Sequence, residues 1–219
     1  MNSRRTVLVS VVVMLIGSTS LLWLVAPDRS AVAGAGLEAI LWPEPQPIAD
    51  FELTTQHGEA FGPESFAGRW SLVFFGYLDC PDVCPMSLGA MRAMQRRLAG
   101  QGVAPERLQF VLVSVDSDND DPARMRGYLE AIAPGFIGLT GSPAMIRRLA
   151  DSMAVYYTTQ GSAREQEAIP RIDHTSSLMI VGPDGRTLGA FQPPLEPSRM
   201  AAGLEALFLH HSGMQIAGN

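Results

Sequence analysis

Residues 72–85 read LVFFGYLDCPDVCP and contain the chain's two cysteines, Cys80 and Cys84. The apolar run at the start of this stretch predicts a buried strand that ends just before the cysteines. Apolar residues then recur at helical spacing over 86–99, directly after a proline that suits a first helical position. We therefore expect Cys84 at a helix N-terminus, where the positive end of the helix favours the thiolate. Such a pair is either a redox centre or a soft-metal site.

The composition is that of one ordinary globular domain. The chain has 219 residues, is 47% hydrophobic and carries a net charge of −6. This acidic balance, with a pI near 5.2, argues against nucleic-acid binding. All 16 basic residues are Arg, which excludes a lysine-dependent mechanism.

The N-terminal segment is predicted to enter a membrane. Arg4 and Arg5 precede residues 7–25, which carry no charge and are long enough, at about 1.5 Å per residue, to cross a layer of about 30 Å. We expect an uncleaved signal anchor over residues 1–26, with late cleavage near Ala31 as the alternative. The two arginines should remain cytoplasmic. This orientation predicts a single-pass protein of the bacterial inner membrane whose soluble domain lies in the periplasm.

Three further segments are expected after the anchor. Residues 27–47 end in alternating prolines and are predicted to be a spacer. Residues 48–211 form the domain, and residues 212–219 are predicted to be a flexible tail. The domain should be α/β, since a second apolar strand at 108–115 follows the first strand and its helix and should therefore pair in parallel.

The remaining elements follow from periodicity and turn residues. A β-hairpin at 51–61 should precede the first central strand, and a second hairpin at 177–191 should come near the end. Between and after these regular pairs we expect a helix at 125–132, a strand at 136–139, a helix at 146–153, an edge strand at 155–157, a surface loop at 161–168 and a final helix from Pro197.

One histidine stands out as a metal-ligand candidate. His174 follows Asp173 directly before the second hairpin, whereas His57 lies in a turn and should be solvated. Two thiolates and one imidazole form a donor set that suits copper. Zinc remains open, because Asp79 or Asp173 offers an oxygen ligand. The structure must show whether the histidine and the cysteines come together.

Two other groups near these residues are expected to be structural. The acidic residues after the second central strand are Asp116, Asp118, Asp120 and Asp121. Asp121 should cap the next helix, and the others should lie in a solvated loop. Three methionines follow the cysteines at helical spacing and are expected to pack in the core: Met86, Met91 and Met94.

The combination of CPDVCP at 80–85, SVD at 114–116, GLTG at 138–141 and DHT at 173–175 resembles the Sco (SenC) family of copper-insertion proteins, over roughly residues 47–210. The resemblance implies a thioredoxin-like fold with an N-terminal β-hairpin extension, preceded here by one transmembrane helix. It also implies an assembly role for cytochrome c oxidase.

In that family, the positions of Cys80, Cys84 and His174 bind one copper, as Cu(I) or Cu(II). The resemblance implies that the copper comes from a donor protein and goes to the dinuclear copper centre of cytochrome c oxidase subunit II. This chain has Leu78 and Asp79 where the family often has Thr-His, and it lacks Pro-Glu-Arg after Asp116. Such neighbouring groups tune redox potential and metal oxidation state.

Other functions for the cysteine pair remain open. The strand, cysteine and helix order equally fits a thiol-disulfide oxidoreductase that acts on the oxidase or on another exported protein. Three residues separate Cys80 from Cys84, whereas such enzymes usually have two. A metallochaperone with stoichiometric reductase activity would combine both roles without being an enzyme. A structural disulfide and a peroxidase are weaker alternatives.

Overall fold

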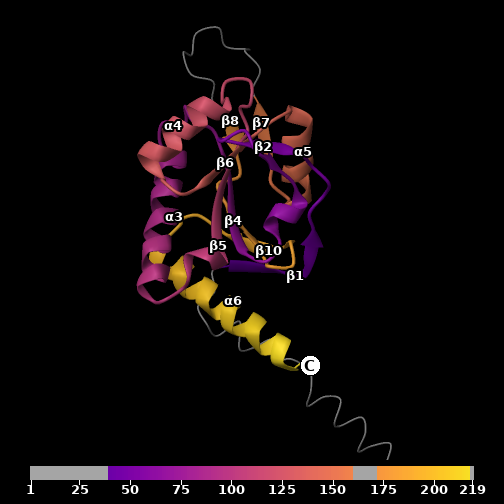
Figure 1. Ribbon diagram of the computed structural model, residues 1–219, viewed down its shortest axis with the longest axis vertical. Coiled ribbons are helices and arrows are strands. Elements are labelled where there is room, and N and C mark those ends of the chain that lie inside the picture. Colours follow the sequence, from indigo (N-terminus) through magenta and orange to yellow (C-terminus); the bar gives the residue numbers. More distant parts are fainter. Residues whose placement is uncertain (1–38, 160–171, 218–219) are drawn as a thin grey trace, which may run out of the picture. The chain divides into compact units, whose positions relative to one another are not determined.

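The computed structural model describes residues 39–159 and 172–217, and its centre is one mixed sheet (Figure 1). Strand β4 (Trp70–Gly76) is central because it pairs in parallel with β5 (Leu108–Ser114) and antiparallel with β9 (Leu178–Val181). Strand β6 (Ile137–Thr140) continues the parallel part beyond β5. All seven residues of β4 are buried, which explains the uninterrupted apolar run in its sequence.

The outer strands complete an eight-stranded sheet in the order β1-β10-β9-β4-β5-β6-β2-β3. Their bounds are β1 Ala39–Pro47, β2 Leu53–Thr55, β3 Ala60–Phe61 and β10 Arg186–Phe191. The pairs β2–β3 and β9–β10 are the two predicted hairpins. A separate two-stranded sheet joins β7 (Tyr157–Thr159) to β8 (Ile172–His174).

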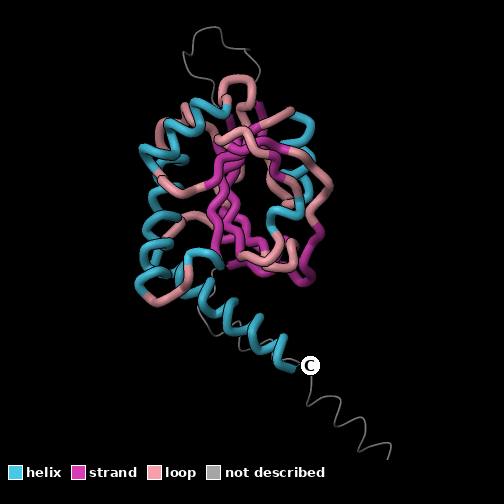
Figure 2. The backbone as a smooth tube through the Cα atoms, in the orientation of Figure 1, coloured by secondary structure: helices cyan, strands magenta, loops and turns pink. Residues whose placement is uncertain are grey.

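Helices cover both faces of the sheet (Figures 1 and 2). Their bounds are α3 Val83–Gly100, α4 Pro122–Ile132, α5 Pro143–Ser152 and α6 Pro197–Ala217, with short 3₁₀ turns at Pro63–Phe66 and Pro105–Arg107. Figure 1 shows α3 and α4 on one side of the sheet and α5 on the other. Helix α3 also packs against α6.

Aromatic side chains fill the core between these layers. Phe74 is fully buried in β4. Phe110 of β5 stacks on Phe136 with ring centroids 4.8 Å apart. Trp70 lies 5.1 Å from the Phe208 ring, which fastens α6 to the start of β4.

Two predicted segments differ from the structure. The prediction of a spacer over residues 27–47 is wrong for residues 39–47, because these residues form strand β1, which pairs with β10. Prolines are tolerated there because β1 is an edge strand with a register shift between Leu41 and Gln46. The prediction of a flexible tail over residues 212–219 is wrong for residues 212–217, because helix α6 continues to Ala217. A single glycine at 213 costs only about 1 kcal/mol, so it does not stop the helix.

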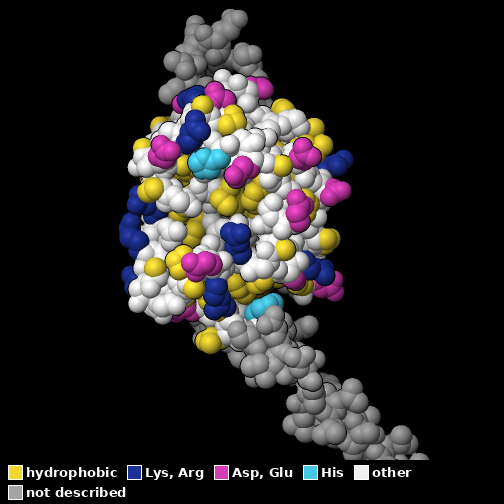
Figure 3. Space-filling view, viewed as in Figure 1, with side chains coloured by type: hydrophobic (Ala, Val, Ile, Leu, Met, Phe, Trp, Pro, Cys, Tyr) yellow, Lys and Arg dark blue, Asp and Glu magenta, His cyan; other side chains and the backbone are white. Residues whose placement is uncertain are grey.

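Several predictions fall outside the described residues. These are the anchor over 1–26, the spacer over 27–38 and the loop over 161–168. Within residues 39–159 and 172–217, no helix is long and apolar enough to cross a membrane. On the face drawn in Figure 3, Arg side chains are mixed with Asp and Glu over the middle of the molecule, and several Arg side chains lie together along its left edge.

Candidate metal and redox site

The two cysteines meet at the start of α3. Cys84, the second residue of that helix, is 1% exposed, whereas Cys80 in the preceding loop is partly exposed. The backbone N–H of Cys84 donates to the Cys80 sulfur at 3.4 Å, and the two cysteines form no disulfide in the structure. A side chain at Gly76 would put its Cβ 2.8 Å from Cys84 Sγ. The strand must therefore end in glycine for the buried thiol to fit.

The prediction of a thiolate at the helix end is wrong for Cys84. Burial raises the pKa of this thiol far above its usual range, and the neighbouring Cys80 and Asp120 raise it further. The backbone of Tyr77 lowers the pKa, but by less than burial raises it. Cys84 is consequently a neutral thiol in the metal-free protein. A soft cation bound at the pair would compensate for the loss of its proton.

The backbone of His174 lies toward the same edge of the sheet as the cysteines. Strand β8 ends at His174, opposite Tyr157 of β7. Four residues after His174, β9 begins at Leu178, whose partner in β4 is Phe74, near the C-terminal end of that strand. The chain therefore enters β9 at the edge where β4 delivers the cysteine loop. The imidazole of His174 is outside the described side chains.

Asp120 was wrongly expected in a solvated loop. Its side chain is fully buried, and its Oδ2 accepts hydrogen bonds from the Leu78 backbone N–H at 3.1 Å and from Ser114 Oγ at 2.7 Å. Its backbone oxygen accepts from Thr140 Oγ1 at 2.8 Å. Burial raises the pKa of this carboxyl, and the bonds from Ser114 and Leu78 partly offset that rise. Asp120 thus ties the cysteine loop to the ends of β5 and β6.

Arg124 links Asp120 to the residue beside the first cysteine. Its Nη2 lies 2.8 Å from Asp79 Oδ1, and its Nη1 lies 3.5 Å from Asp120 Oδ1. Asp121 caps α4 as predicted by accepting from the Arg124 backbone N–H at 2.8 Å. The Asp79 carboxylate is therefore paired with Arg124 in the structure, whereas the sequence had offered it as an oxygen ligand for zinc.

Tyr128, one turn after Arg124 on α4, is a neighbour of the site that sequence reasoning missed. Its hydroxyl is buried and has no hydrogen-bond partner among the described residues. Burial, with smaller contributions from Cys84, Cys80 and Asp120, raises the pKa of this phenol to about 12. The spacing of four residues from Arg124 was the available signal, because it places both side chains on one helix face.

The methionine prediction holds for two of three residues. Met91 and Met94 are fully buried, as expected, but Met86 is 73% exposed. The buried residues of α3 already include Cys84 in its first turn, and Met86 lies two residues after Cys84, on the opposite side of the helix. His57 is exposed in its turn, as predicted. Among the described side chains, no three His, Cys, Asp or Glu groups converge as metal ligands.

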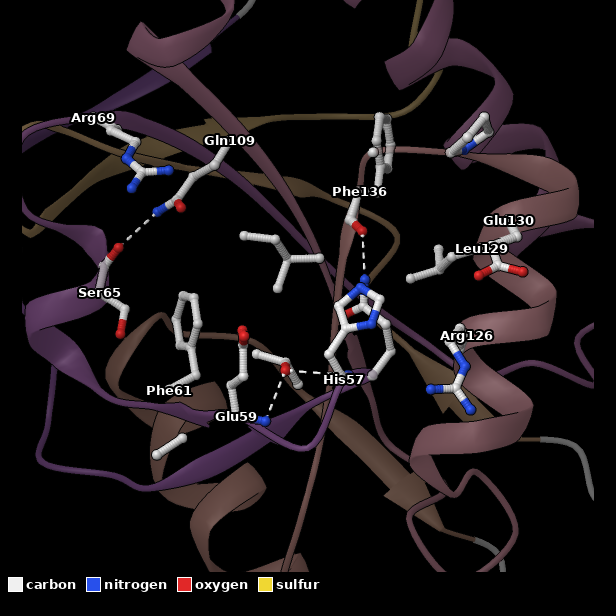
Figure 4. A pocket seen from close by; sticks show the side chains of 16 residues that line it. His57, Glu59, Phe61, Ser65, Arg69, Gln109, Arg126, Leu129, Glu130 and Phe136 are labelled. Carbon is white, nitrogen blue, oxygen red and sulfur yellow. Dashed lines mark hydrogen bonds between the residues drawn. The ribbon is translucent and has the colours of Figure 1, made fainter.

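A cavity of about 630 Å³ lies away from the cysteines, between the β2–β3 hairpin and α4 (Figure 4). Its wall contains both signs of charge, with Arg69 and Arg126 alongside Glu59 and Glu130. Neither cysteine lines this cavity. The chemistry of the site therefore lies at the start of α3.

The fold and the cysteine pair define a thioredoxin-like α/β protein whose dithiol follows a central strand. A family model described as SCO1/SenC matches residues 43–209. The chain belongs to the SCO1/SenC family, as the sequence motifs predicted.

Relatives of known name support this assignment. The chain is 36% identical over 173 residues to "Putative copper-binding protein" of Stutzerimonas stutzeri. This match covers 78% of this chain and 81% of the relative. It is 30% identical over 154 residues to "Protein SCO1 homolog, mitochondrial" of Homo sapiens, covering 70% of this chain and 50% of the relative. The chain thus spans about half the length of the human relative.

A solved structure of a relative contains copper. The structure of Bradyrhizobium japonicum ScoI with copper bound is 33% identical and superposes with a TM-score of 0.63. The match covers 73% of this chain and 98% of that one. The likeness extends over nearly the whole of the copper-bound domain.

Proposed function

We propose that this chain is a copper metallochaperone that binds one copper through Cys80, Cys84 and His174. The observation that carries the proposal is the contact at the start of α3, where the Cys84 N–H donates to Cys80 Sγ at 3.4 Å. Two soft sulfur donors so close together suit Cu(I), and the imidazole of His174 would complete a three-coordinate set. The copper-bound relative with the same fold supports copper over zinc.

The unequal exposure of the two thiols suggests how copper is exchanged. Cys80 is reachable from solvent, whereas Cys84 is buried against Gly76. A partner's sulfur would approach at Cys80 first, and Cys84 would hold the metal until the ligands have been exchanged. By its family resemblance, the chain would receive copper from a donor protein and deliver it to the dinuclear copper centre of cytochrome c oxidase subunit II.

The proposed location follows from the sequence of residues 1–26. Two arginines precede an uncharged stretch long enough to span a membrane. We propose that this segment anchors the chain in the bacterial inner membrane, with the dithiol in the periplasm. An epitope after Asn219 should then be accessible to protease in spheroplasts, and residence of that epitope in the cytoplasm would contradict the orientation.

The decisive experiment is copper stoichiometry with X-ray absorption on residues 36–219, beside the His174→Ala variant. We expect about one copper per chain, with two sulfurs and at least one nitrogen around it. His174→Ala should lose the nitrogen shell and weaken binding. His57→Ala is the matched control, because His57 is exposed in its turn and lines a cavity to which neither cysteine contributes. Unchanged geometry and affinity in His174→Ala would refute the assignment of this ligand.

Copper affinity should depend on pH because binding displaces the Cys84 proton. The raised pKa keeps this thiol protonated near neutrality, so metal must compete with the proton. The Cu(I) affinity should therefore rise with pH, by about tenfold per unit for this one proton. Titration against a chromophoric Cu(I) chelator between about pH 6 and 8 measures the slope. An affinity that stayed level or fell with pH would show that the Cys84 sulfur does not bind as a thiolate.

A thiol-disulfide oxidoreductase is the second candidate. It is favoured by one observation, the combination of an accessible Cys80 with a buried Cys84. In such a reaction Cys80 attacks a substrate disulfide, and Cys84 then displaces the substrate's second thiol to leave a Cys80–Cys84 disulfide. Multiple-turnover reduction of a disulfide peptide by copper-free protein, with glutathione as the reductant, would favour this function. A single turnover at most is expected of a chaperone.

A further inference from the structure

The loop that carries Cys80 is held at two consecutive residues, by Asp120 just before α4 and by Arg124 in the first turn of α4. The Leu78 backbone N–H is bound by the buried carboxylate of Asp120 at 3.1 Å. The Asp79 carboxylate is bound by the Arg124 guanidinium at 2.8 Å. Both contacts come directly before Cys80 in the chain. They therefore restrain the two residues that precede the first thiol.

Arg124 is itself fixed in place. Its backbone N–H is capped by Asp121, and its Nη1 donates to the Asn119 backbone oxygen at 2.7 Å. The same Nη1 lies 3.5 Å from the buried Asp120. One guanidinium thus joins the exposed Asp79 to the carboxylate that holds Leu78. We call the Asp79–Arg124 ion pair the loop clasp.

The clasp acts on Cys80 because Cys84 has little freedom to move. Cys84 belongs to α3, and its sulfur is packed against Gly76. The distance between the two sulfurs therefore depends on the Cys80 loop. A disulfide requires the sulfurs at about 2.05 Å with a fixed dihedral angle. In the structure, Cys80 Sγ instead accepts a hydrogen bond from the Cys84 N–H, which belongs to the dithiol form.

We propose that Arg124 is a positioning residue that acts through Asp79 to hold Cys80 in the dithiol arrangement and so disfavours the Cys80–Cys84 disulfide. The inference rests on the proposed function only in one respect, namely that the dithiol is kept in order to bind copper. The clasp itself is a property of the metal-free protein. It also gives a role to Asp79, which stands at one of the two places where this chain departs from the family pattern.

The test is the redox equilibrium of metal-free protein, residues 1–219, with glutathione. Oxidised glutathione accepts two electrons and two protons from the Cys80 and Cys84 thiols, which yields the protein disulfide and two glutathione thiols. Arg124→Ala and Asp79→Ala should each favour the disulfide by about fivefold, which corresponds to about 20 mV for a two-electron couple. The expected effect is small because the ion pair is exposed, with side chains 43% and 46% accessible.

The two substitutions distinguish an effect of loop position on the redox equilibrium from a direct effect of charge on the thiols. They remove charges of opposite sign, so a purely electrostatic effect on the thiols would shift the equilibrium in opposite directions. Loss of one shared contact shifts it in the same direction, and the double variant adds little to either single one. Arg126→Ala is the matched control, because Arg126 lies two residues further on α4 and lines the cavity in Figure 4, to which neither Asp79 nor Cys80 contributes.

The outcomes decide the inference separately from the proposed function. The inference is supported if Arg124→Ala and Asp79→Ala shift the redox equilibrium equally and Arg126→Ala shifts it less. It also requires that the two shifts are not additive in the double variant. Opposite shifts, no shift, or an equal shift in the control overturn it. Asp79→Ala keeps the Arg124 contacts to Asp120, so it remains informative if Arg124→Ala folds poorly. A wild-type protein that binds no copper would refute the chaperone function but leave these redox results standing.

Discussion

Replacing Cys84 with serine is expected to lower Cu(I) affinity by about 100-fold or more. Substitutions among residues that only orient metal ligands typically cost about 10- to 100-fold, and a lost ligand should cost at least as much. A serine hydroxyl is a hard, weakly acidic donor, whereas Cu(I) prefers thiolate. The measurement is competition with a chromophoric Cu(I) chelator at fixed pH, together with copper stoichiometry after gel filtration.

Ser87→Ala is the control for this substitution. Ser87 is also buried, and it lies one turn after Cys84 on the same helix. It should keep the copper affinity of the wild-type chain. Far-UV circular dichroism should show that both variants are folded. If Cys84→Ser retained wild-type affinity while folded, the buried thiol would not be a ligand, and the three-coordinate proposal would be wrong.

The largest loss of stability is expected from Phe110→Ala, at about 3–5 kcal/mol. Phe110 is 2% exposed in β5, and its ring stacks on Phe136 at 4.8 Å. Truncation removes the burial of the ring and leaves a cavity between two layers that cannot close fully. Since a whole domain is typically stable by about 5–15 kcal/mol, this loss brings the protein close to unfolding. Urea denaturation followed by circular dichroism measures it.

Met86→Ala provides the contrast. The Met86 side chain is 73% exposed, so its truncation should change the free energy of unfolding by less than about 0.5 kcal/mol. The sequence pattern alone would assign Met86 to the core with its two helical neighbours. If Met86→Ala lowered the free energy of unfolding as much as Phe110→Ala, the Met86 side chain would have to be buried, which contradicts the structure.

Much of the fold could be predicted because its signals are local. The apolar run in β4 and the strand–helix–strand order predicted the parallel pair, and the turn residues predicted both hairpins. Errors occurred where local and tertiary preferences differ. Prolines in 39–47 indicated a spacer, yet an edge strand forms because β10 offers a free edge on that side.

The candidate site shows the same division. Cys80 and Cys84 were identified from spacing alone, since two soft donors before a helix form a recognisable pattern. Asp120 was not identified, because its burial depends on contacts with Leu78 and Thr140, which are far away in sequence. The carboxylate of Asp79 could be noted as unusual, but only the contact with Arg124 gives it a partner.

By itself, the sequence determined which donors are present, their place at the end of a central strand and the family to which the chain belongs. Only the tertiary structure decided the protonation of Cys84. A helix N-terminus favours a thiolate, but close packing against Gly76 removes that sulfur from water and raises its pKa. Spacing reveals which groups neighbour one another along the chain, whereas solvation depends on layers that meet only when the chain has folded.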